Sequence, residues 1–221
     1  KVNMGQKVHP IGFRTGSFLP WRSRWFATGR EASNFLIEDV KIREMLMKKL
    51  ALAGVVSVEI ERLSKSIVVA VAVSRPGVVI GRGGVGIEDV KKSILEVMAE
   101  HRGGVMPKNV KIEIPVREVK QPDLAAQLVL TRIISDLERR LPHRRAVTKA
   151  MERVMQAGAL GVKIQLSGRI GGADISRVEK YQQGSMPAQT LRRVIDYAEA
   201  PASLKKGYVG IKVWIHKKPE E

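Results

Sequence analysis

The alternation of hydrophobic and polar positions in the first half of the chain predicts one helix followed by two strands. The helix is expected to start at Ser33 or Asn34, which can cap it, and to stop at Gly54. Residues 55–63 alternate with period two, which is typical of a half-buried strand. Residues 66–74 are valine-rich on both faces and predict a central strand, and the two-residue link between these strands fits a hairpin.

The pattern then breaks at a proline and a run of glycines. Pro76 suits the first turn of a short helix, which the glycines would end. A longer helix over residues 86–104 and an alternating strand over residues 109–119 follow. The predicted order over residues 34–118 is therefore helix, strand, strand, short helix, glycine loop, helix, strand.

The second half of the chain predicts a separate unit that begins near Gln121, where a proline precedes a new helix. Two helices are expected, Asp123–Leu141 and Arg144–Ala157, separated by Pro142. Further along, the patterns predict strands at 161–169, within 171–186 and at 207–218, and a short helix starting at Pro187.

The glycine run contains two overlapping motifs. Gly81, Gly83 and Gly86 spell the G-x-G-x-x-G of a dinucleotide-binding turn, but that turn needs its first glycine directly after a strand of a parallel unit. Residues 76–80 intervene here, and the preceding strands are joined too tightly to be parallel. The order of elements is instead that of a type II KH domain, whose G-x-x-G loop clamps single-stranded RNA. The residues of this KH loop are Gly81, Arg82, Gly83 and Gly84. A helix-turn-helix elbow without a ligand is the alternative.

The net charge of the chain indicates which class of partner it binds. The 221 residues carry a formal net charge of +17 and a pI of about 10.4, which favours a polyanionic partner. Because the chain has no cysteine, disulfides and thiolate metal sites are excluded. No apolar run approaches the roughly 20 residues that a membrane helix needs. We therefore expect a soluble, cytoplasmic protein.

Residues 1–30 hold no acidic residue and are broken by prolines and glycines, so they predict an irregular basic arm. Aromatic rings stand between its cations, and such a mixture suits RNA, since bases stack on rings and arginine meets phosphate. Rings that simply pin the arm to a domain are an equally good interpretation. The candidate RNA contacts of the arm are Lys7, His9, Arg14, Trp21, Arg22 and Arg24.

Six stretches, which extend from Met4 to about Lys217, resemble the family of bacterial small-subunit ribosomal protein number three. They are MGQKVHPIGFR, the W…WF group at Trp21, Trp25 and Phe26, VVIGRGG, HRRAVTKA, VKIQLSGRIGGADISR and VGIKVWI. The resemblance implies an α+β protein: a basic arm (1–30), a KH type II domain with helices on a small mixed sheet (31–120), and a C-terminal α/β domain with helices on a separate, mostly antiparallel sheet (121–221).

The resemblance also implies a place in the head of the small ribosomal subunit, where the partners are ribosomal RNA, neighbouring head proteins and mRNA. The residues that match the family's mRNA-entry helix are Arg144, Arg145 and Lys149, while Thr148 is neutral where the family often has a base. Arg169 and Arg177 flank Gly171-Gly172; this bend is either a plain turn or a second point of approach to RNA.

Two alternatives belong to other classes: a free-standing KH-type RNA chaperone or translational regulator, and a nucleotide-dependent enzyme built on the G-x-G-x-x-G pattern. We expect no catalytic residue, no cofactor, no metal site, no small-molecule substrate and no membrane partner. The four histidines are isolated in sequence and lack metal-ligand spacing: His9, His101, His143 and His216.

Overall fold

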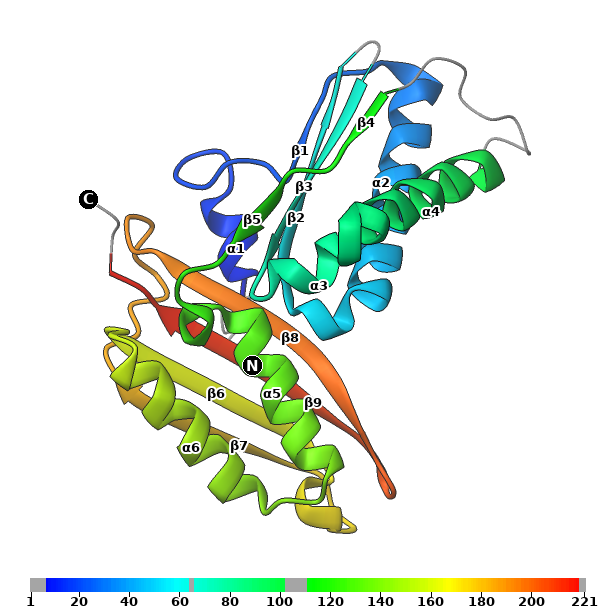
Figure 1. The fold of residues 1–221 in the computed structure, drawn as a ribbon. Helices are drawn as coiled ribbons and strands as arrows, with labels where there is room; N and C mark the ends of the chain where they lie inside the picture. The colour runs from blue at the N-terminus through cyan, green and yellow to red at the C-terminus, as the bar shows by residue number, and fades with distance from the viewer. Residues whose placement is uncertain (1–6, 64–65, 102–110, 219–221) are drawn as a thin grey trace. The chain divides into compact units, whose positions relative to one another are not determined.

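The computed structural model describes residues 7–63, 66–101 and 111–218, and the described chain divides into two compact units (Figure 1). The KH unit is Trp21–Lys120. The C-terminal unit joins residues 7–20 to residues 121–218. The predicted arm is thus shared between the units, and it is not wholly irregular, since helix α1 spans Pro10–Arg14 and strand β1 spans Ser23–Arg24.

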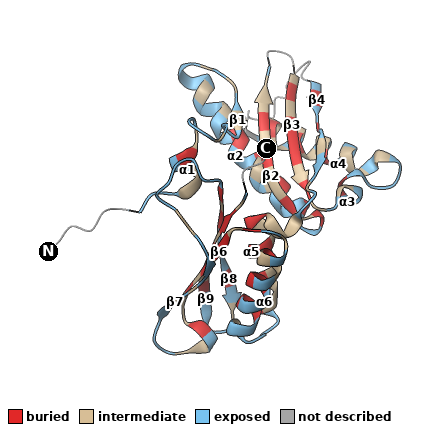
Figure 2. Cartoon of the chain, turned by 90° about the vertical axis from the view of Figure 1, so that its left-hand side faces the viewer, coloured by how far each residue is buried: buried red, intermediate tan, exposed pale blue. Residues whose placement is uncertain are grey.

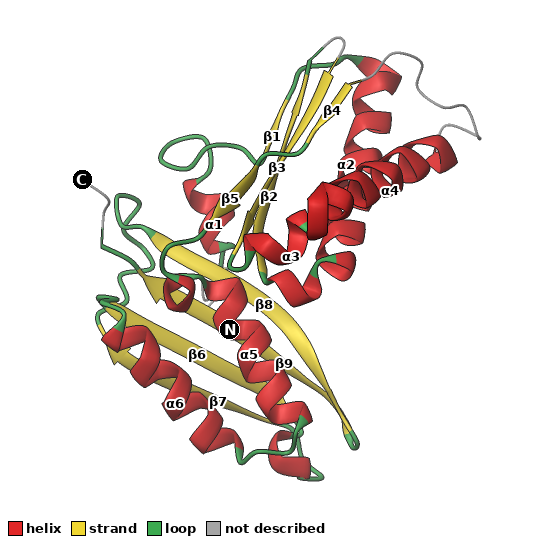
Figure 3. Cartoon of the chain, viewed as in Figure 1, coloured by secondary structure: helices red, strands yellow, loops and turns green. Residues whose placement is uncertain are grey.

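The KH unit confirms the predicted order of elements. Its helices and strands are α2 (Gly29–Lys49), β2 (Val55–Arg62), β3 (Ser66–Val73), α3 (Pro76–Ile80), α4 (Val85–His101), β4 (Lys111–Glu113) and β5 (Val116–Glu118). Helices α2 and α4 cover one face of its sheet (Figure 3). Helix α2 begins at Gly29, one turn before the predicted caps Ser33 and Asn34, which lie inside it.

The sheet of the KH unit is mixed, as predicted. Strands β2 and β3 are antiparallel, with Ile60 opposite Val69, whereas β4 and β5 both pair with β3 in parallel and β1 pairs with β2 in parallel. The single strand predicted at 109–119 is divided around Pro115, which has no N–H to donate to the ladder. The predicted hairpin link at residues 64–65 and the helix end at residues 103–104 lie outside the described residues.

The C-terminal unit places helices α5 (Ala126–Glu138) and α6 (His143–Gln156) on one face of a four-stranded sheet (Figure 3). Its strands are β6 (Gly161–Gly168), β7 (Arg177–Gly184), β8 (Ile195–Leu204) and β9 (Gly207–His216). They lie in the order β7-β6-β9-β8 and every pairing is antiparallel. The predicted α+β fold with two separate sheets is therefore confirmed.

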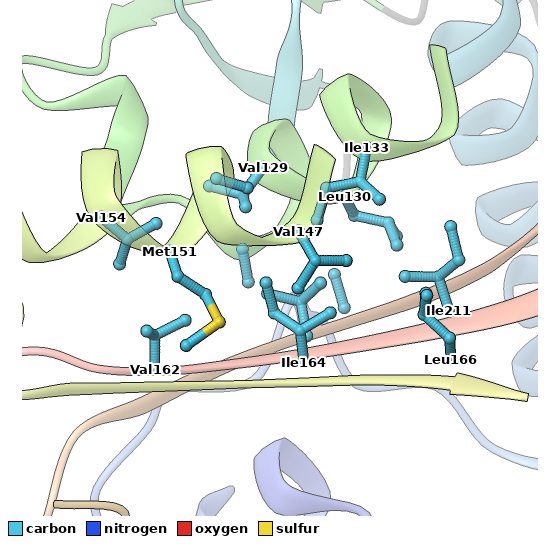
Figure 4. Packing of buried hydrophobic residues seen from close by; sticks show 14 of the residues in the cluster. Val129, Leu130, Ile133, Val147, Met151, Val154, Val162, Ile164, Leu166 and Ile211 are labelled. Atoms are coloured by element: carbon cyan, nitrogen blue, oxygen red, sulfur yellow. The ribbon is translucent and has the colours of Figure 1, made fainter. Parts of the chain in front are cut away.

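Each unit buries its own aliphatic core, and buried residues follow the strands and the inner sides of the helices (Figure 2). In the C-terminal unit Val162, Ile164 and Leu166 of β6 are fully buried and face Val147 and Met151 of α6 (Figure 4). Fully burying such a side chain contributes about 1.5–3 kcal/mol, so this layer fixes the orientation of α6. The opposite side of α6 is left to solvent.

The helix predicted from Pro187 is wrong. Residues 187–194 form turns, and Ile195–Leu204 is strand β8, paired with β9 along its whole length. The reason is Arg14, whose guanidinium takes up carbonyl groups that a helix would have used. Its Nε donates to the carbonyl of Arg193 at 2.9 Å, and its Nη2 donates to the carbonyls of Ala188 and Thr190 at 3.0 and 2.9 Å. A side chain 174 or more residues away in sequence therefore shapes this loop.

The burial of Arg14 leads to a stability prediction. The residue is 1% exposed, and burial lowers the pKa of its guanidinium. Lysine keeps the charge but cannot make the planar fork of bonds, so Arg14→Lys should lower the free energy of unfolding by about 2–3 kcal/mol. Urea unfolding measures the loss, and Arg193→Lys, at an exposed position of the same loop, should change it by less than about 0.5 kcal/mol. Equal effects of the two substitutions would contradict the assignment.

Candidate nucleic-acid interface

The KH loop connects α3 to α4 through backbone conformations that favour glycine. Gly81, Gly83 and Gly84 have φ of 69°, 63° and 83°, all in the region that L side chains rarely adopt. Gly86 has a different role: a Cβ there would lie 2.4 Å from the carbonyl oxygen of Val79, so its glycine allows α3 and α4 to approach closely. The third glycine of the dinucleotide-like pattern is thus explained by helix packing.

The KH loop is open to a ligand. Gly81, Arg82 and Gly83 are exposed, and a Cβ added at Gly83 or Gly84 would meet nothing within 4 Å. Arg82 forms no ion pair with any described residue. The N-terminal end of α4 lies directly after the loop, and the positive end of the helix dipole there favours an anion. A sugar–phosphate backbone can therefore reach the loop without steric hindrance.

A second basic surface lies on α6. Arg144, Arg145 and Lys149 are exposed, whereas Val147 and Ala150 on the other side are buried against the sheet. Within the described part of the chain, neither Arg145 nor Lys149 has an acidic partner within ion-pair distance. These cations stand on a helix that is held rigid by the core beneath it.

Arg144 lies beside a small polar network at the start of α6. The carboxylate of Glu179 is 3.1 Å from Nε2 of His143 and 2.7 Å from Nε of Arg177, and it accepts a hydrogen bond from the hydroxyl of Tyr181. That hydrogen bond chiefly lowers the pKa of Glu179, with smaller contributions from the charges of His143, Arg177 and Arg144. Arg177, although half-exposed, is therefore partly neutralised.

Arg169 is also engaged within the protein. Its Nε donates to the carbonyl of Ala173 at 2.8 Å and its Nη2 pairs with Asp174 at 2.8 Å. These bonds close the turn at Gly171-Gly172, so the interpretation of this bend as a plain turn gains support. Arg169 is still 41% exposed at its side chain.

Most of the candidate arm residues are exposed, and some of them also form bonds within the protein. Lys7, His9, Trp21 and Arg22 are exposed, while Arg24 pairs with Glu61 at 2.8 Å. His9 also caps α1, since its Nδ1 accepts from the backbone N–H of Gly12.

The assignment of Arg14 to RNA contact is corrected, because its guanidinium is buried and its donors are used within the protein. The structure also shows that Lys163, Lys212 and Trp214 line one pocket, and the sequence pattern had not singled out these residues. The signal was present in the alternation of β6 and β9, which points these residues away from the core.

Neither a membrane-crossing helix nor a cluster suited to a metal ion is found among the described residues. No helix there is long and apolar enough to cross a membrane. Nor do three or more histidine or acidic side chains among them gather in a way that could hold a metal ion.

Comparison with known proteins covers both units. The KH domain model matches residues 41–124, and the model described as ribosomal protein S3, C-terminal domain, matches residues 133–215. Small ribosomal subunit protein uS3 of Finegoldia magna is 46% identical over 214 residues, which cover 97% of this chain and 84% of that protein. The uS3 proteins of Persephonella marina and Xanthomonas axonopodis pv. citri are 45% and 46% identical over the same share of this chain, covering 90% and 84% of their own lengths. With its KH domain and its S3 C-terminal domain in this order, the chain belongs to the family of small ribosomal subunit protein uS3.

Proposed function

We propose that this protein is a structural constituent of the head of the small ribosomal subunit, in the cytoplasm, that binds ribosomal RNA and helps to guide and unwind incoming mRNA. The family is one of ribosomal proteins and not of enzymes. Two exposed basic surfaces on rigid supports, the KH loop and the outer face of α6, carry the proposal.

The KH loop is suited to backbone contact and not to base readout. Its glycines let phosphates approach the main chain, and Arg82 adds a charge without an acidic partner among the described residues. Contacts of this kind position an RNA strand but carry little sequence information. A protein that holds a large folded RNA needs this kind of contact, and the net charge of +17 fits the same role.

The outer face of α6 is suited to a passing mRNA strand. Arg144, Arg145 and Lys149 offer charge without aromatic rings, so they would hold phosphates of any sequence. Thr148 lies exposed among them and adds no charge.

Neighbouring head proteins would find apolar contact area on α2, where Leu36 and Val40 are 55% and 44% exposed.

A triple substitution tests the role of α6. Arg144→Ala, Arg145→Ala and Lys149→Ala should leave assembly of small subunits intact, because these side chains do not enter the core. Translation through a structured leader should slow, whereas an unstructured leader should be translated at the unchanged rate. For isolated protein, the slope of log affinity for single-stranded RNA against log salt should weaken by about 2. Failed assembly, or equal slowing on both leaders, would show that these residues are structural.

A further inference from the structure

The C-terminal sheet carries a pocket on the face opposite its helices. It has a volume of about 620 Å³ and lies between the sheet, the segment from Lys7 to Phe13 and the loop from Met186 to Gln189. Pockets of roughly 300–1,000 Å³ are the usual size for small ligands. We call it the sheet pocket.

The floor of the sheet pocket is fixed by strand register. Lys163, Trp214 and Tyr197 form one row across β6, β9 and β8, and the next row is Gln165, Lys212 and Glu199. Side chains of adjacent strands in one row lie side by side on the same face. The walls are fixed by Arg14, whose bonds hold α1 to the loop before β8.

Aromatic rings line this floor and its rim. The rings of Tyr197 and Trp214 are 5.2 Å apart between centroids, and the ring of His9 meets Tyr197 edge-on at 4.8 Å. Phe13 at the rim is 41% exposed. Tyr197 itself is buried, so a base would stack on the more exposed rings of His9, Phe13 or Trp214, and stacking contributes about 1–3 kcal/mol per base.

Positive charge surrounds these rings. Lys163 places its Nζ 5.4 Å from the centroid of the Trp214 ring, and Lys7 and Lys212 also line the pocket. Burial lowers the pKa of Lys163 most, and the nearby charges of Lys7 and Lys180 lower it further. An anion would relieve this repulsion. Glu199 is the one acidic residue in the lining as far as the chain is described, and it is already held by Tyr197 and by Lys212 at 3.2 Å.

We propose that the sheet pocket binds one unpaired nucleotide of RNA, with the base against the aromatic rings and the phosphates on Lys7, Lys163 and Lys212. An acidic protein segment fits less well, since carboxylates favour the bidentate fork of arginine and no arginine among the described residues lines the pocket. The proposal rests on the proposed function, because it adds an RNA subsite to a protein already taken to bind RNA.

Tryptophan fluorescence of the full chain tests the proposal. Octaadenylate should quench the emission of a Trp21→Phe variant, and Trp214→Phe added to that variant should remove the quenching. Lys163→Ala with Lys212→Ala should weaken binding of octaadenylate about tenfold. The matched control, Lys41→Ala with Lys205→Ala, removes two exposed lysines that do not belong to the lining and should change affinity less than about twofold.

The possible outcomes separate the two proposals. If octaadenylate binds through the KH loop but leaves Trp214 unquenched, the sheet-pocket proposal is overturned while RNA binding stands. Quenching by octaglutamate and not by octaadenylate would overturn it in favour of a protein segment. If the chain binds no RNA even in dilute salt, the proposed function itself fails.

Discussion

Replacing Asp39 by alanine is expected to lower the free energy of unfolding of the KH unit by about 3–5 kcal/mol. Asp39 and Glu38 on α2 are both fully buried. Arg62 of β2 donates to Asp39 at 2.6 and 2.9 Å and to Glu38 at 2.8 Å, and Trp25 donates its indole N–H to Asp39 at 2.8 Å. Without the carboxylate, the guanidinium of Arg62 loses two hydrogen bonds and the indole N–H of Trp25 loses its acceptor. Urea unfolding followed by tryptophan emission reports the loss.

Two controls separate this cost from a general effect of substitution. Glu44→Ala removes an exposed carboxylate from the same helix and should change stability by less than about 0.5 kcal/mol. Replacing Asp39 and Arg62 together by leucine should cost clearly less than the sum of the two single changes, because the carboxylate and the guanidinium that bond to each other are removed together. A cost below about 1 kcal/mol for Asp39→Ala would show that the cluster does not hold α2 to the sheet.

The second large effect concerns binding. Arg82→Asp with Gly83→Asp should weaken RNA binding strongly and reduce the slope of log affinity against log salt by about one for each lost phosphate contact. The fold should survive, because Arg82 is exposed and a Cβ at Gly83 meets nothing within 4 Å. Aspartate also tolerates the left-handed conformation better than most residues. The measurement is a fluorescence anisotropy titration at several salt concentrations.

The chain offers a closely matched control for this variant at Gly29 and Arg30. Gly29 has φ of 59° with open space around it, and Arg30 is exposed, so Gly29→Asp with Arg30→Asp introduces the same residues and the same change of charge in the same unit. It should reduce RNA affinity much less than the loop variant. Equal losses would mean that net charge, and not contact at the KH loop, governs binding.

Sequence pattern predicted the two sheets well because their strands obey simple local rules. Val162, Ile164 and Leu166 alternate with polar residues and are buried, and the valine-rich β3 is the central strand that its two apolar faces indicated. The G-x-x-G motif could be assigned from the order of its neighbours alone. These features depend on residues that lie close together in sequence.

The errors arose where distant residues decide the local structure. Nothing near Pro187 indicates that Arg14 binds the carbonyls of that loop, so the loop was expected to be helical. The same contact made Arg14 seem a free cation of the arm. Lys163, Lys212 and Trp214 come together only through the pairing of β6 with β9, which sequence pattern does not reveal.

Salt dependence of binding to small-subunit ribosomal RNA tests the central claim most directly. If exposed cations such as Arg82, Arg145 and Lys149 offset phosphates, the affinity of the full chain should fall by about a thousandfold or more between roughly 50 and 200 mM monovalent salt. Binding that is unaffected by salt over this range, or no binding in dilute buffer, would contradict the account.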